Sequence, residues 1–84
     1  MVDQSELDWI AQKASELLVD KVKDAPLTDR DIELAFDMFA KTRIQRLSDF
    51  FESELERKQA EDFIIRKLQE RAKQLNAEHW QKSE

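Results

Sequence analysis

Apolar residues recur at helical spacing in the first part of the chain, from about residue 5 to residue 23. They fall three or four positions apart and therefore share one face of an amphipathic helix. Ser5, with Asp8 three residues later, is the expected N-cap. Pro26 ends the helix, since proline lacks an amide donor and disfavours helical backbone in the residue before it. The apolar positions are Leu7, Ile10, Ala11, Ala14, Leu17, Leu18 and Val22.

Trp9 does not join this apolar stripe. At 100° per residue it lies on the opposite face of the helix, roughly 150° from the centre of the full stripe. We expect the indole to be either exposed to water or covered by another chain, which makes Trp9 a candidate protein-binding residue.

A second helix is predicted over residues 28–46. Thr28 and Asp31 have the spacing of a capping box at its start. Its main stripe consists of Ile32, Ala35, Phe36 and Phe39. Continued as a straight helix, this stripe includes Arg43 and Arg46. The helix is therefore expected either to leave the core there or to bend between residues 41 and 48.

Leu34 and Met38 form a second apolar stripe on roughly the other side of this helix. A helix that is apolar on two faces usually contacts two neighbours. The pair either packs against the third helix as ordinary core or contributes to an interface with a partner, and we include both residues in the candidate interface.

The third helix is predicted over residues 49–80. Asp49 and Glu52 offer a capping-box start, although an uninterrupted helix from residue 28 fits equally well. Phe63 points away from the apolar stripe, and Trp80 also lies off it. The stripe comprises Ile64, Ile65, Leu68, Ala72, Leu75 and His79. Part of it fits about two heptads, which makes this stripe a possible homodimer seam.

These patterns predict an all-α fold: a three-helix bundle, or a long helical hairpin with a packed N-terminal helix, in a single domain over residues 1–84. A core this small leaves only a few kcal/mol of stability, and such chains often gain more from a second copy. A homodimer is therefore expected.

Composition removes several function classes. The 84 residues contain no Gly and no Cys. Without Gly there is no P-loop, dinucleotide fingerprint or EF-hand loop, and without Cys no disulfide framework, thiolate nucleophile or zinc finger. The N-terminal residues are acidic and lack the apolar segment of a signal peptide, and no apolar run is long enough to span a membrane. The expected location is the cytoplasm, with no membrane partner.

Charge is unevenly distributed along the chain, whose net charge is −5. Residues 1–40 hold ten acidic and four basic residues, a net charge of −6, whereas residues 41–84 have a net charge of +1. The acidic first half argues against direct binding to nucleic acid. It suits a basic partner surface or simply solubility. A helix-turn-helix over residues 28–51 keeps a DNA-associated regulator open as an alternative.

One segment resembles a known family. Residues 27–35, LTDRDIELA, followed by Arg43, Ile44 and Leu47, resemble a stretch of the Hha/YmoA nucleoid-modulating proteins over about twenty residues. Those proteins are small helical partners of a DNA-binding silencer. The resemblance implies a similar partnership as an alternative function, and it assigns no residue a role.

Candidate chemistry is sparse. His79 is the single histidine and lies near the end of the last helix, with no predicted partner for general-base catalysis. The acidic residues of the second helix lack a loop that would organise them around a cation. We therefore expect neither an enzyme nor a cofactor or metal site.

The residues left off the core stripes favour protein binding instead, since Trp and Met are enriched in interfaces. They are Trp9, Leu34, Met38, Phe63 and Trp80. The sequence therefore predicts a small regulatory or adaptor protein. A third alternative is an acidic phage-type inhibitor that mimics nucleic acid.

Overall fold

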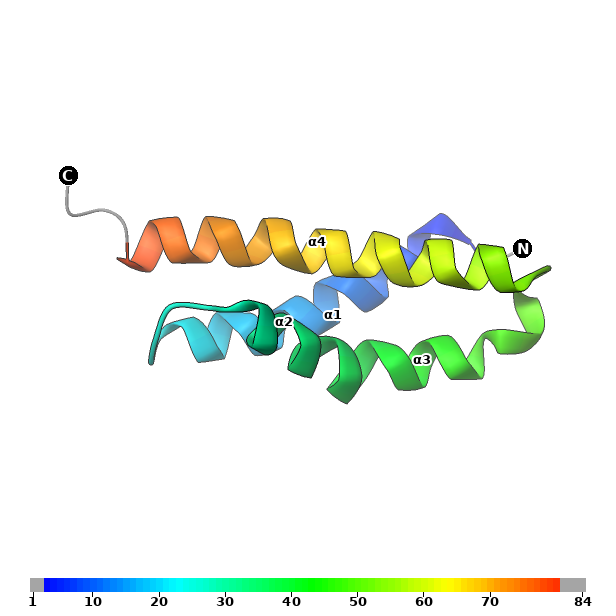
Figure 1. Cartoon of the computed structure of the whole chain (residues 1–84), viewed down its shortest axis with the longest axis horizontal. Coiled ribbons are helices and arrows are strands. Elements are labelled where there is room, and N and C mark those ends of the chain that lie inside the picture. Colours follow the sequence, from blue (N-terminus) through cyan, green and yellow to red (C-terminus); the bar gives the residue numbers. More distant parts are fainter. Residues whose placement is uncertain (1–2, 81–84) are drawn as a thin grey trace.

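A computed structural model describes residues 3–80 and shows an all-α bundle built from three helical rods (Figure 1). The first and last rods run parallel to each other, and the middle rod runs antiparallel to both. The molecule is elongated, with extents of 47 × 20 × 18 Å. The rods are α1 (Gln4–Val22); α2 (Asp29–Ala35) continued by η1 (Phe36–Ala40) and α3 (Lys41–Arg46); and, after the short η2 (Ser48–Phe50), α4 (Glu54–Trp80).

Helix α1 buries a stripe that is close to the predicted one. Ile10, Ala14, Leu18 and Val22 are at most 1% exposed. Leu17, however, is 38% exposed, so its predicted place in the core is wrong. The buried face is centred nearer Leu18, because α4 and the middle rod both pack against α1 and leave Leu17 at the edge of their contact.

The start of α1 also differs from the prediction. Its N-cap is Asp3, whose side chain accepts a hydrogen bond of 3.3 Å from the backbone N–H of Ser5. Ser5 therefore lies inside the helix. The start of α2 agrees with the prediction: Thr28 and Asp31 form the capping box, and the Thr28 N–H donates to Asp31 Oδ2 at 2.9 Å.

The middle rod contains a π-turn, η1, which changes its hydrophobic phase. A π-turn holds one residue more than an α-turn and so rotates everything after it around the helix axis. The buried positions that follow are Ala40 and Ile44, at 0% and 1% exposure, instead of Phe39 and Arg43. Because of this rotation, Arg43 does not fall in the apolar stripe, where the straight-helix pattern had placed it. The rod stays helical from Asp29 to Arg46, without the turn that a helix-turn-helix over residues 28–51 requires.

A break separates the middle rod from α4. The Ser53 hydroxyl accepts a hydrogen bond of 3.2 Å from the Glu56 N–H, and the Glu56 carboxylate accepts one of 2.6 Å from the Glu52 N–H. The bond to Ser53 satisfies an amide donor that the first helical turn leaves unpaired, and the bond from Glu52 links the segment before α4 to its first turn. Helix α4 therefore begins at Glu54, later than the predicted residue 49, and the alternative of uninterrupted helix is wrong.

The apolar stripe of α4 packs within the chain, mainly against α1. Leu68, Ala72 and Leu75 are at most 5% exposed. The predicted homodimer seam along this stripe is therefore wrong, because α1 already covers it. The more polar start of α4 carries ion pairs from Arg57 to Glu54 and Glu61, at the spacings that support an exposed helix.

Two polar side chains fasten the end of α4 to the α1–α2 connection. Asn76 Oδ1 accepts a hydrogen bond of 2.7 Å from the Leu27 N–H, and Asn76 Nδ2 donates one of 3.0 Å to the Leu27 carbonyl oxygen. The Trp80 indole N–H donates to the Val22 carbonyl oxygen at 2.8 Å. These bonds satisfy backbone groups that no helix or sheet pairs, so they hold the connection around Pro26 in place.

Candidate protein-interaction surface

An apolar hollow of about 250 Å³ lies between α1 and the middle rod. Its exposed apolar members are Leu17, Leu34 and Met38, at 38%, 39% and 70% exposure. Leu34 and Met38 therefore do not pack against α4 as core. Lys21 and Asp31 stand at its edge with their charged atoms 4.0 Å apart. A hollow with apolar walls and a charged rim is the usual arrangement of a protein-binding surface.

Trp9 forms a second cluster with residues of the middle rod. Its ring centroid lies 5.9 Å from that of Phe39, and the Arg43 guanidinium lies 5.0 Å from the Trp9 centroid and 5.2 Å from that of Phe39. Lys13 approaches the same indole at 5.9 Å. Trp9 remains 39% exposed. The expectation that only water or another chain would cover Trp9 is therefore wrong in part, because its own chain covers one side of the ring.

The two clusters both lie along the contact between α1 and the middle rod. Trp9 and Leu17 both extend from α1 toward η1, Trp9 onto Phe39 and Leu17 beside Met38, the residue before Phe39. We call Trp9, Leu17, Leu34 and Met38 the α1–η1 face. Together they expose roughly 300–400 Å² of mainly apolar surface, within the range of the largest patch on a typical monomer, which is often functional.

The other two candidate residues lie elsewhere. Phe63 is half-buried and packs against the core near Leu7 and Phe51, with the Lys67 ammonium 5.6 Å from its ring centroid. Trp80, 45% exposed, is at the far end of α4 and bonded to Val22. Both side chains have contacts within the chain, and neither joins the α1–η1 face.

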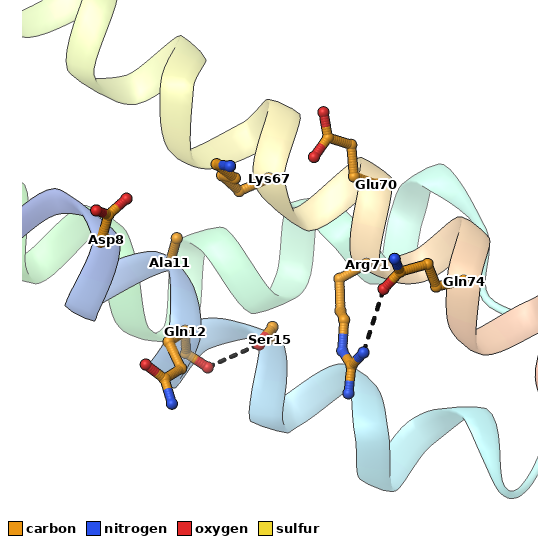
Figure 2. Close-up of a pocket in the computed structure, with 8 residues that line it drawn as sticks. All are labelled: Asp8, Ala11, Gln12, Ser15, Lys67, Glu70, Arg71 and Gln74. Carbon is orange, nitrogen blue, oxygen red and sulfur yellow. Dashed lines mark hydrogen bonds between the residues drawn. The ribbon is translucent and has the colours of Figure 1, made fainter.

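A polar hollow of about 290 Å³ lies between α1 and α4 (Figure 2). Ala11 and Ser15 form its α1 wall, while Lys67, Glu70 and Arg71 extend from α4. Ser15 donates to the Gln12 carbonyl oxygen at 2.7 Å, and Arg71 donates to Gln74 at 3.2 Å. Its charged side chains are all exposed. Nothing buried is aimed into this hollow, so it holds no arrangement for capturing a specific ligand.

Sequence reasoning placed Leu17 in the core with Leu18, although the two lie 100° apart and Leu17 is at the edge of the predicted stripe. It also attached no importance to Phe50 and Leu55, which are 60% and 65% exposed around the break before α4. The signal for that break was present in the sequence, because Ser53 and Glu56 have capping-box spacing.

The described residues, 3–80, include the single histidine of the sequence but no cluster of candidate metal ligands. His79 is exposed on the last turn of α4. Within this described part, no three His, Cys, Asp or Glu side chains gather as metal ligands. None of its helices combines the length and apolar character needed to cross a membrane. Comparison with known proteins found no matching family model, no matching curated protein and no matching solved structure.

Proposed function

We propose that this chain is a non-catalytic protein–protein interaction module, a small regulatory or adaptor protein of the cytoplasm, which binds its partner through the α1–η1 face. The observation that carries the proposal is the exposure of Leu17, Leu34 and Met38 around one apolar hollow, with Trp9 exposed further along the same contact between α1 and the middle rod.

The residue types on this face support the proposal. Trp and Arg are the residues that most often dominate binding energy, and here Arg43 lies over the Trp9 ring. Met38 is the most exposed apolar side chain of the group, and an unbranched thioether adapts its shape to different partners. It lies in a π-turn, a feature found frequently at functional sites.

The alternatives have less support. A DNA-associated regulator would use basic residues such as Arg43, which is engaged with two aromatic rings and packed beside an acidic helix. An acidic mimic of nucleic acid would use charge and not an apolar hollow. Neither alternative explains why four large apolar side chains remain exposed along the contact between α1 and the middle rod.

The proposal is tested by site-specific photo-crosslinking in cells that express the protein. A photoreactive amino acid replaces Met38 in one variant and Glu78, on the exposed side of α4, in the matched control. The expected result is a protein cross-linked from position 38 and not from position 78, identified by mass spectrometry. The identified protein is then purified and titrated against the wild type and Met38→Asp.

A carboxylate in the apolar hollow is expected to weaken this binding at least about tenfold, since burying an unpaired charge is costly. Glu78→Asp is expected to bind like the wild type. Equal cross-linking from both positions, or equal affinity of Met38→Asp and the wild type, contradicts the proposal.

A further inference from the structure

The outward side of α1 carries a regular series of exposed residues. At 100° per residue, seven of them fall within a sector of about 100° that is centred near Trp9 and points away from the core stripe. All seven are exposed. In chain order they are Ser5, Glu6, Trp9, Lys13, Glu16, Asp20 and Lys23.

The charges in this sector are antisymmetric about the point midway between residues 14 and 15. Glu6 and Lys23 lie at equal distances from that point and carry opposite charges, as do Lys13 and Glu16. Trp9 is matched with Asp20. Because the Arg43 guanidinium lies 5.0 Å from the Trp9 ring centroid, this pair also joins a cation to an acid.

We propose that the partner of the α1–η1 face is a second copy of this chain, with the two α1 helices antiparallel across a two-fold axis opposite residues 14 and 15. The inference rests on the proposed function and names its partner. A two-fold axis brings each position in contact with its mirror position, so Lys13 of one copy faces Glu16 of the other, and the reverse. Four of the five charged residues in the sector then face an opposite charge, and Asp20 faces the Trp9 ring that Arg43 approaches.

The same axis also covers the exposed apolar residues of α1. With a rise of 1.5 Å per residue, Leu17 lies about 4 Å and Trp9 about 8 Å from the axis along the helix. Both therefore fall within the contact, and Met38, which lines the same hollow as Leu17, lies beside it. Lys13 and Glu16 lie about 2 Å from the axis along the helix, so charged pairs form the centre of the contact and the apolar side chains flank them.

Other arrangements of two α1 helices bring like charges together. A parallel pair places Lys13 against Lys13 and Glu16 against Glu16. An antiparallel pair shifted by seven residues places Lys13 against Lys23 and Glu16 against Asp20. Like charges in contact suppress wrong pairings, so the sequence of α1 selects one register.

The decisive experiment mixes two charge-reversal variants, Lys13→Glu and Glu16→Lys. Each alone sets like charges against each other twice across the axis, and its dimer is expected to dissociate at least about tenfold more readily than the wild type. In the mixed dimer, both contacts between copies are again between opposite charges. The 3.8 Å pair between Lys13 and Glu16 within each chain stays broken. Recovery on mixing therefore reports a contact between copies.

Sedimentation equilibrium measures each dissociation constant, and native mass spectrometry identifies the mixed dimer. The wild type is expected at twice the chain mass of 10.0 kDa at micromolar concentration, and the mixed dimer within about threefold of its affinity. Lys73→Glu and Glu78→Lys, which make the same charge changes on exposed positions of α4, are expected to dimerise like the wild type. Circular dichroism verifies that all variants are folded.

Two results overturn the inference. A wild type that stays monomeric at several hundred micromolar excludes the second copy. A dimer that withstands both reversals, or fails to recover on mixing, excludes this register. A monomer that still cross-links another protein from position 38 retains the proposed function and loses only the identity of its partner, so the two failures are distinguishable.

Discussion

Replacing Asn76 by alanine tests whether its side chain holds the α1–α2 connection against α4. The side chain forms two hydrogen bonds with the backbone of Leu27, of 2.7 Å and 3.0 Å. Leu27 is only 7% exposed, so water replaces the lost partners poorly. Each bond between uncharged groups contributes about 0.5–1.5 kcal/mol, and the pair therefore about 1–3 kcal/mol. The higher helix propensity of alanine offsets roughly 0.5 kcal/mol of this loss in stability.

The net loss in the free energy of unfolding is expected to be about 1.5 kcal/mol. For a domain of this size, that corresponds to a fall in Tm of roughly 6–12 °C. Urea denaturation followed by circular dichroism measures the difference, provided that the m-value is unchanged. Amide exchange at Leu27 gives a second, local measurement and is expected to accelerate.

Two further variants sharpen the test. Asn76→Asp keeps the acceptor for the Leu27 N–H but sets a carboxylate oxygen against the Leu27 carbonyl, so its loss at pH 7 is expected to equal or exceed that of alanine. Glu78→Ala changes an exposed residue of the same helix and is expected to alter stability by less than about 0.5 kcal/mol. If Asn76→Ala is as stable as Glu78→Ala, the two bonds do not stabilise the fold and the reasoning is wrong.

The remaining predictions concern stability at three other positions. Leu18→Ala, at a site 1% exposed, is expected to cost about 2–5 kcal/mol, whereas Leu17→Ala should cost less than about 1 kcal/mol; equal losses in denaturant titrations would show that the burial pattern of α1 is misassigned. Ser53→Ala removes the N-cap of α4 and is expected to cost about 1 kcal/mol, with faster amide exchange in its first turn only. Trp80→Phe keeps an aromatic ring but loses the bond to the Val22 carbonyl oxygen, and a loss outside about 0.5–1.5 kcal/mol would contradict that role.

The sequence predicted most of the fold because local signals determine most of it. Pro26 ends the first helix, and the Thr28–Asp31 capping box starts the second. Periodicity identified three helical segments and the buried stripe of α4. It failed at Leu17, since the edge of a buried face depends on where neighbouring helices cross. The sequence of one helix does not determine those crossing points. Periodicity failed again after Phe36, where helical spacing assumes 3.6 residues per turn and the π-turn departs from that value.

The candidate site was predicted only in part, for the same reason. Leu34 and Met38 were recognised as a second stripe, but the sequence left open whether they pack as core, and their neighbour Leu17 comes from another helix. The contact of Trp9 with Phe39 and Arg43 depends on the rotation introduced by the π-turn. Trp80 was assigned to an interface because no local pattern in the sequence reveals its hydrogen bond with Val22, which is 58 residues away.

The π-turn over Phe36–Ala40 is equivalent to a one-residue insertion that the helix has absorbed. Ile32 and Ala35 before it, and Ile44 after it, are all in phase with the core because the π-turn takes up that extra residue. Deleting one residue here would convert the segment into regular α-helix and leave Ile32, Ala35 and Ile44 facing the core. Homologues that have one residue fewer in this segment are therefore expected to keep the same buried positions in an uninterrupted helix.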